Sequence, residues 1–248
     1  MSRPTLTEDL ARYVLPPAAF DGLSLAAVDA PALARFWAAV LGAPVTETGD
    51  GRFRIDPAAG RPDKEIVRVG PVRQAGTRQS RVHLDVRLPG ADPGHIIAAG
   101  GRLLRGPGTD PWYVLADPEG NEFCAFPAVD DRPAGIFELV VKCSDAHGLA
   151  RWWADVIGGK ATDEGDAAAV VGAPEFPWDY MVFDPVPGIE RVPGRMRWHL
   201  IARDPDPSAL IGLGATVLAG PGPSRPWWLL ADPGGNEFCV TCEQSATD

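Results

Sequence analysis

The sequence predicts an α+β protein in which one arrangement of strands and helices occurs twice in tandem. Two near-copies of a hairpin-like stretch, residues 110–124 and 225–239, each carry an apolar run followed by Asp-Pro-x-Gly-Asn-Glu-Phe-Cys. Proline presets φ and glycine tolerates positive φ, so Asp-Pro-x-Gly is a strong turn signal between strands. His83 and His199 are 116 positions apart, as are Leu33 and Leu149. A spacing held over most of a domain indicates a duplicated fold.

The composition is that of an ordinary globular protein. The 248 residues suit two domains, with 45% hydrophobic and 23% charged residues. The net charge of −10 disfavours nucleic acid and anionic membrane surfaces as partners. No apolar run approaches the ~20 residues of a membrane helix, and no signal peptide is visible. Four cysteines without framework spacing predict reduced thiols and a cytoplasmic location.

The chain is expected to divide into four segments. Residues 1–19 form an N-terminal arm with a short helical pattern that stops at two prolines. The first repeat occupies residues 20–127 and the second residues 135–243, with a proline-rich, charged linker at 128–134 between them.

Each repeat opens with a strand, at residues 21–28 or 137–143, followed by a helix. Asp29 and Asp145 are the expected helix caps, and Gly42 and Gly158 the expected stops. Between cap and stop, apolar residues fall at i, i+3, i+4, i+7 and i+8, which is typical of a helix with one buried face.

The second half of each repeat is expected to form a strand centred on a histidine, a short helix and a hairpin. The strands are residues 81–88 and 197–202, and the short helices residues 93–99 and 207–213. Each repeat therefore reads as strand, helix, strands, strand, short helix, strands.

This order, together with the histidine strand and the repeated Leu-Ala-Asp-Pro-x-Gly-Asn-Glu-Phe-Cys, resembles the vicinal oxygen chelate superfamily. More narrowly, it is similar to glyoxalase-like domains common in actinobacteria. The resemblance implies two tandem glyoxalase/bleomycin-resistance-like domains, each of paired βαβββ modules with a curled, mostly antiparallel sheet around a cavity. The superfamily contains metalloenzymes, metal-free enzymes and drug-sequestering proteins, so fold transfers across the resemblance and reaction does not.

Strand alternation predicts which side chains face the cavity. In residues 81–88 the valines and leucines share one face, leaving Arg81, His83, Asp85 and Arg87 on the other. The same reasoning places the following residues of repeat two on one concave surface: Glu138, Lys142, His199, Glu237 and Cys239. Glu122 lies at the position of repeat one that matches Glu237.

Tryptophan distribution favours repeat two as the ligand-binding half, because six of the eight tryptophans lie there. Trp178, Tyr180 and Trp228 are the aromatic candidates for a ligand wall. Repeat one carries small residues on its first strand and is expected to supply mainly structure.

The resemblance implies metal-ligand positions on the first strand, the histidine strand and the last strand of each repeat. In repeat one these positions hold Gly22, His83 and Cys124, and glycine offers no ligand. In repeat two they hold Glu138, His199 and Cys239, with cysteine in place of the usual glutamate. We therefore expect no metal cofactor; the alternative is a divalent metal, zinc being the most tolerant, at Glu138, His199 and Cys239.

The favoured function is that of a metal-independent isomerase, lyase or cyclase of secondary metabolism. Glu138 and Glu237 are the expected bases and His199 the expected acid, in a cavity that also contains Lys142, Cys239, His83 and Glu122. The alternative is a non-catalytic protein that sequesters a drug or metabolite and confers antibiotic resistance. A metal-dependent lyase or dioxygenase is the third hypothesis. The expected partner is a small molecule, and the chain is expected to be a monomer with a pseudo-twofold or a homodimer.

Overall fold

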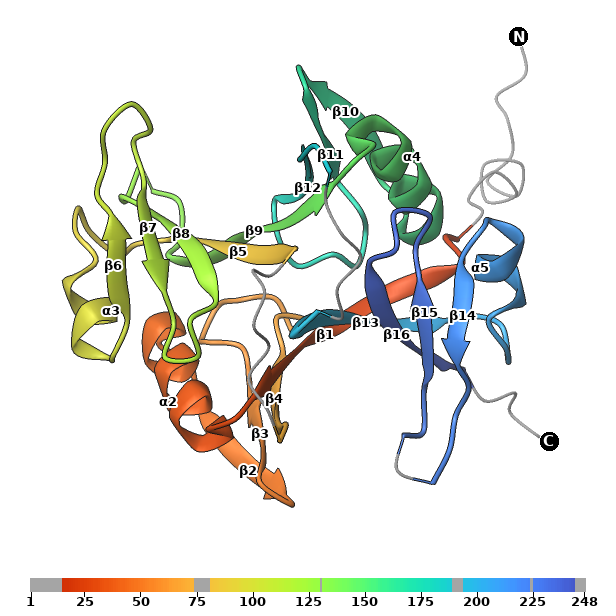
Figure 1. The fold of residues 1–248 in the computed structure, drawn as a ribbon, viewed down its shortest axis with the longest axis horizontal. Helices are drawn as coiled ribbons and strands as arrows, with labels where there is room; N and C mark the ends of the chain where they lie inside the picture. The colour runs from red at the N-terminus through yellow and green to blue at the C-terminus, as the bar shows by residue number, and fades with distance from the viewer. Residues whose placement is uncertain (1–14, 74–80, 130, 189–193, 224, 244–248) are drawn as a thin grey trace, which may run out of the picture.

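The computed structural model describes residues 15–73, 81–129, 131–188, 194–223 and 225–243. Its helices and strands form four βαβββ modules (Figure 1). The first module contains β1 (Ala18–Ala27), α2 (Ala30–Leu41), β2 (Val45–Gly49), β3 (Arg52–Ile55) and β4 (Val67–Pro71). The second contains β5 (Val82–Arg87), α3 (Gly94–Ala98), β6 (Arg102–Arg105), β7 (Tyr113–Ala116) and β8 (Glu122–Phe126).

The second repeat follows the same order. Its first half contains β9 (Gly135–Cys143), α4 (Ala146–Ile157), β10 (Lys160–Glu164), β11 (Ala167–Val171) and β12 (Tyr180–Pro185). Its second half contains β13 (Met196–Ala202), α5 (Ser208–Gly212), β14 (Thr216–Ala219), β15 (Trp228–Ala231) and β16 (Glu237–Cys242). The predicted α+β class and the paired βαβββ modules are confirmed. The helical pattern expected near the N-terminus lies outside the described residues.

Each of the two eight-stranded sheets contains strands from both repeats. Sheet A has the order β14-β15-β16-β13-β1-β4-β3-β2, and sheet B the order β10-β11-β12-β9-β5-β8-β7-β6. The two halves of sheet A meet where β1 pairs antiparallel with β13, and those of sheet B where β5 pairs antiparallel with β9. Figure 1 shows both central pairs side by side near the middle of the molecule. Each concave surface is therefore built from half of each repeat.

The long helices begin and end where the sequence indicates. The Asp29 carboxylate accepts a hydrogen bond from the backbone N–H of Ala32, and that of Asp145 from Gly148. Gly42, at φ 61°, adopts the left-handed conformation that ends α2. These caps satisfy backbone groups that the helix itself leaves unpaired.

The helices hold the two modules of one repeat together. Helix α2 packs on β3 and β4 of sheet A, while its Trp37 ring lies 5.1 Å from that of Phe123 in sheet B. In the second repeat Trp153 of α4 packs on Phe238 of sheet A at 5.2 Å, and α4 itself lies on β11 of sheet B. Strand pairing thus joins the two repeats, and helix packing joins the modules within each. Among the described residues, no helix combines the length and hydrophobicity needed to span a membrane.

Candidate functional site

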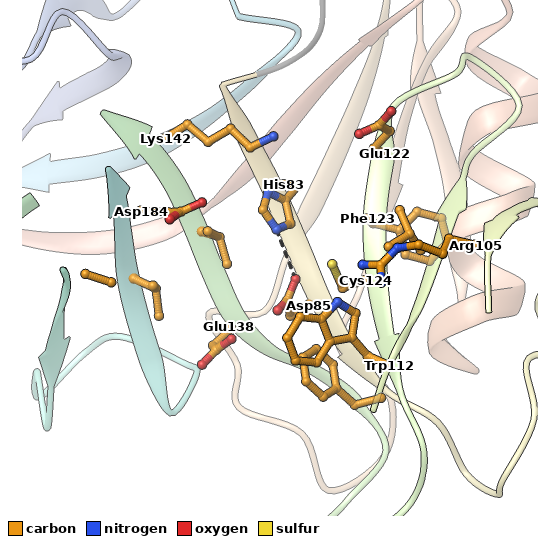
Figure 2. A pocket seen from close by; sticks show the side chains of 15 residues that line it. His83, Asp85, Arg105, Trp112, Glu122, Phe123, Cys124, Glu138, Lys142 and Asp184 are labelled. Atoms are coloured by element: carbon orange, nitrogen blue, oxygen red, sulfur yellow. Dashed lines mark ion pairs between the residues drawn. The ribbon is translucent and has the colours of Figure 1, made fainter. Parts of the chain in front are cut away.

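Sheet B encloses a cavity of about 460 Å³ (Figure 2). Its wall includes side chains of β5, β8, β9 and β12, so it takes residues from both repeats. The polar side chains lining it are His83, Asp85, Arg105, Glu122, Cys124, Glu138, Lys142 and Asp184. His83 and Asp85 on β5, and Glu138 and Lys142 on β9, therefore face this cavity.

Strand β5 places His83 and Asp85 on one face because they are two residues apart. Nε2 of His83 lies 3.3 Å from Oδ1 of Asp85, and their side chains are 16% and 7% exposed. Oδ1 of Asp85 is buried and forms no hydrogen bond with any residue in the described ranges. A buried carboxylate oxygen without a hydrogen bond is costly, and the imidazole of His83, 3.3 Å away, is a polar group facing this atom.

Asp85 on β5 is the register partner of Glu138 on β9. Burial raises the pKa of Glu138 to about 8, and the negative charge of Asp85, together with a hydrogen bond between the two carboxyl groups, acts in the same direction. Two neighbouring carboxyl groups in a poorly solvated place resist ionising together. Glu138 therefore holds its proton beside Asp85, between the strands that join the two repeats.

Cys124 and Lys142 lie beside His83 and Asp85 in the polar part of the cavity. The ligand atoms of His83, Asp85 and Cys124 all lie within 4.8 Å of one another. Burial, with Asp85 nearby, raises the pKa of the Cys124 thiol, so this cysteine is protonated in the absence of a bound cation. Lys142 forms no ion pair with another described residue, and Figure 2 shows its ammonium group on the same side of the site as His83.

Aromatic residues close one side of the cavity. The rings of Trp112 and Phe126 stack at 5.1 Å, and Phe126 meets Phe137 edge to face at 5.2 Å. Trp112 is the tryptophan that lines this cavity, and it belongs to the first repeat. An apolar wall beside a carboxyl pair excludes water, which favours the neutral form of a carboxyl group.

The matching positions of sheet A are filled differently. The repeats are offset by 116 residues, so Gly22 of the first repeat matches Glu138 and Ala26 matches Lys142. In the second repeat Ile201 matches Asp85. An added Cβ at Gly22 would lie 2.6 Å from the Ile66 carbonyl oxygen and 3.0 Å from Nη1 of Arg68. Sheet A therefore keeps a histidine but has neither carboxyl group of the pair.

His199 in sheet A is hydrogen-bonded to the Ser24 hydroxyl and packs edge to face on Trp227. Burial lowers the pKa of His199 to about 4, with Arg68 and Arg197 contributing. Arg197 holds Glu237 through two contacts, from Nε at 2.7 Å and Nη2 at 2.5 Å.

The predicted grouping of five residues of repeat two on one concave surface is wrong. Glu138 and Lys142 lie in sheet B, whereas His199, Glu237 and Cys239 lie in sheet A. The alternative metal site at Glu138, His199 and Cys239 is not assembled either. Strand periodicity placed Glu138 and Lys142 on the correct face of their strand, but it carries no information about which repeat supplies the neighbouring strand.

The predicted aromatic wall is also dispersed. Trp178 and Tyr180 line a different cavity, and Trp228 lies in sheet A, with Val240 as its register partner. The sequence pattern did not single out Asp85 or Trp112 as site residues. For Asp85 a signal existed, since it shares the polar face of its strand with His83; for Trp112 none did.

The comparisons with known proteins agree with this architecture. A model of the glyoxalase-like domain matches residues 22–126 and again residues 138–241. Glyoxalase I from Zea mays superposes with a TM-score of 0.63 at 15% identity, over 90% of this chain and 92% of that one. A putative dioxygenase from Bacillus subtilis gives 0.61 at 13% identity, over 94% and 87%. No curated protein matches the sequence.

At these identities the structural neighbours establish the fold, and the two family matches cover most of the chain. The chain therefore belongs to the glyoxalase-like domain family of the vicinal oxygen chelate superfamily and carries this domain twice in tandem.

Proposed function

We propose that the sheet B cavity catalyses proton transfer on a small molecule that contains a carbonyl group, as an isomerase, lyase or cyclase does. The observation that carries this proposal is the carboxyl pair of buried Asp85 and half-buried Glu138 in the wall of a cavity of about 460 Å³. A carboxylate whose pKa is raised is a stronger base than an ordinary one. Perturbed carboxyl groups in a cavity are typical of functional sites.

The residues present support a simple sequence of events. Ionised Glu138 takes a proton from the carbon next to the carbonyl group, and the C–H electron pair moves toward the carbonyl oxygen. The ammonium of Lys142 and the imidazole of His83 stabilise the charge that develops on that oxygen. Glu138 then returns its proton to a neighbouring atom, so the enzyme ends in its starting state, and Asp85 holds Glu138 in position throughout.

Hydrogen exchange tests this proposal with simple carbonyl compounds in place of the natural substrate. Compounds with an acidic C–H next to a carbonyl group would be incubated with the protein in D₂O, and loss of that proton followed by ¹H NMR. Glu138→Gln should slow the exchange by roughly 10²-fold or more, the usual scale for a general base. Glu47→Gln, a change at an exposed carboxylate of β2, serves as the control. Exchange that is equally fast in Glu138→Gln would exclude Glu138 as the base.

A metal-dependent reaction is the second candidate, favoured by the clustering of His83, Asp85 and Cys124. Nitrogen, oxygen and sulfur donors fit a zinc-type cation, and Oδ1 of Asp85 lacks a hydrogen bond within the described part of the chain. Bound there, such a cation would polarise a carbonyl oxygen. The three side chains would hold it, and Glu138 would remain beside it as the base.

Elemental analysis separates the two candidates. For the metal-independent reaction, the purified protein contains well under one equivalent of transition metal per chain, and activity survives chelation. About one zinc per chain, lost in Cys124→Ser and kept in Cys239→Ser, would favour the second candidate. Cys239 is the matched control because it ends the second copy of the Asp-Pro-x-Gly-Asn-Glu-Phe-Cys stretch, as Cys124 ends the first.

A further inference from the structure

A second cavity, of about 750 Å³, lies where β5, β9 and β12 continue beyond Glu138. Its wall contains three arginines, Arg61, Arg87 and Arg132, and three aromatic residues, Phe137, Trp178 and Tyr180. We call it the arginine cavity. Neither repeat forms it alone, since Arg61 and Arg87 come from the first, Arg132 from the segment between the repeats, and the aromatic residues from the second.

The arginine cavity adjoins the cavity of about 460 Å³ that contains Glu138, which we call the catalytic cavity, along the same strands. On β5, His83 and Asp85 line the catalytic cavity, and Arg87, the next residue on that face, lines the arginine cavity. On β12, Val182 lines the catalytic cavity and Tyr180 lines the arginine cavity. Both Arg87 and Asp179, in the wall of the arginine cavity, act electrostatically on Glu138. A molecule of moderate length would therefore reach from one cavity into the other.

The charges of the arginine cavity do not balance. Arg61 is neutralised by buried Glu65, with contacts of 2.6 Å and 3.0 Å. Arg87 faces Asp179 at 3.5 Å, a long contact to a carboxylate that is 52% exposed. Arg132 is exposed and pairs with no acidic side chain in the part of the chain that the structure describes. The positive charge of Arg132 therefore has no opposite charge beside it in the wall of the arginine cavity.

The walls are also suited to a flat group. The Arg87 guanidinium carbon lies 4.4 Å above the centre of the Phe137 ring, and Tyr180 also lines this cavity. Guanidinium groups bind carboxylate and phosphate through two parallel hydrogen bonds and also stack on aromatic rings. Charge and shape thus select the same class of ligand, an anion attached to a planar or aromatic group.

We propose that the arginine cavity is a binding site for the carboxylate or phosphate group of an aromatic or planar molecule, and that Arg132 and Arg87 hold this group. That the same molecule places its reactive carbon beside Glu138 rests on the proposed function. Anion binding itself does not, because it depends only on the arginine cavity.

Calorimetric titration of the purified protein with benzoate, phenyl phosphate and uncharged benzyl alcohol tests the inference. Both sources of negative charge are represented, and the anion that binds more tightly identifies the preferred group. We expect saturable binding of at least one anion and about tenfold weaker binding of benzyl alcohol. Arg132→Gln should weaken anion binding by about tenfold, the scale of one charge-assisted hydrogen bond. Arg35→Gln, at an exposed position of α2, removes the same charge elsewhere and should change nothing.

Several results would overturn the inference. They are benzyl alcohol binding as tightly as the anions, no saturable anion binding up to about 10 mM, or wild-type affinity in Arg132→Gln. Anion binding that is lost in Lys142→Met and kept in Arg132→Gln would assign the anion to the catalytic cavity instead. Glu138→Gln should retain anion binding, so failure of the proton-transfer proposal and failure of the anion site give different results.

Discussion

The indole N–H of Trp153 donates a hydrogen bond to Oδ2 of Asp232 at 3.1 Å. In the first repeat Trp37 and Asp117 form the same contact at 3.3 Å. Each aspartate is the first residue of an Asp-Pro-x-Gly-Asn turn, and its carboxylate also binds the asparagine four residues later. The repeated Asp-Pro-x-Gly-Asn motif therefore forms a buried connection between a helix of one module and a hairpin of the next.

Replacing Asp232 should destabilise the protein strongly. The carboxylate accepts hydrogen bonds from Trp153 and from the backbone and side chain of Asn236, and Asp232→Ala leaves these donors buried without a partner. We expect a loss of roughly 3 kcal/mol in the free energy of unfolding and a melting temperature lower by roughly 6 to 12 °C. Chemical denaturation and calorimetry measure both. Exposed Asp204→Ala should stay within about 0.5 kcal/mol, and equal losses in the two variants would refute the role of the turn.

The two matched histidines should differ in function. His83 lies with Asp85 and Glu138, whereas His199 is bound to Ser24 on a sheet without that carboxyl pair. We expect His83→Ala to slow deuterium exchange by at least about tenfold, and His199→Ala to leave the rate within about threefold of wild type. If His199→Ala slowed the exchange more than His83→Ala, the site would lie around His199 in sheet A instead.

The raised pKa of Glu138 predicts a dependence of stability on pH. Because the folded-state pKa, about 8, lies above the ordinary value of 4.5, the folded protein binds this proton more tightly than the unfolded chain. The resulting stabilisation is fully present below pH 4.5 and is lost as the pH rises from 4.5 through about 8. Glu138→Gln carries no such proton, so its stability relative to wild type should increase from pH 5 to pH 8 in urea denaturation. A difference that is flat with pH would contradict the assigned pKa.

A side chain at Gly22 should destabilise the protein more than one at Gly49. Its φ is +96°, and an added Cβ would lie 2.6 Å from the carbonyl oxygen of Ile66. Gly49 is the matched control, since its φ is +105° and an added Cβ would meet nothing within 4 Å. Gly49→Ala should cost about 1 kcal/mol through backbone strain, and Gly22→Ala about 1 to 3 kcal/mol more through overpacking. Equal costs would show that close packing does not exclude a side chain from this position.

The sequence by itself determined the local features of this protein. The duplication, the caps at Asp29 and Asp145 and the cavity-facing side of β5 all follow from short-range rules, because helices and strands repeat every 3.6 and 2 residues. The element order resembled one superfamily closely enough to give the module architecture. Asp85 was placed on the correct face of its strand, but nothing local distinguished it from a solvated carboxylate.

Only the tertiary structure decided which strands are neighbours. Pairing β9 with β5 puts Glu138 beside Asp85, whereas a sheet formed within repeat two would have put it near His199. Strands within one sheet are joined by backbone hydrogen bonds, which nearly every residue can form, so the sequence of a strand specifies its face much better than its partner. The neighbour of β9 is β5 of the other repeat, a long-range contact that appears only in the folded chain. The set of residues around the sheet B cavity, and the existence of the arginine cavity beside it, follow from that strand pairing.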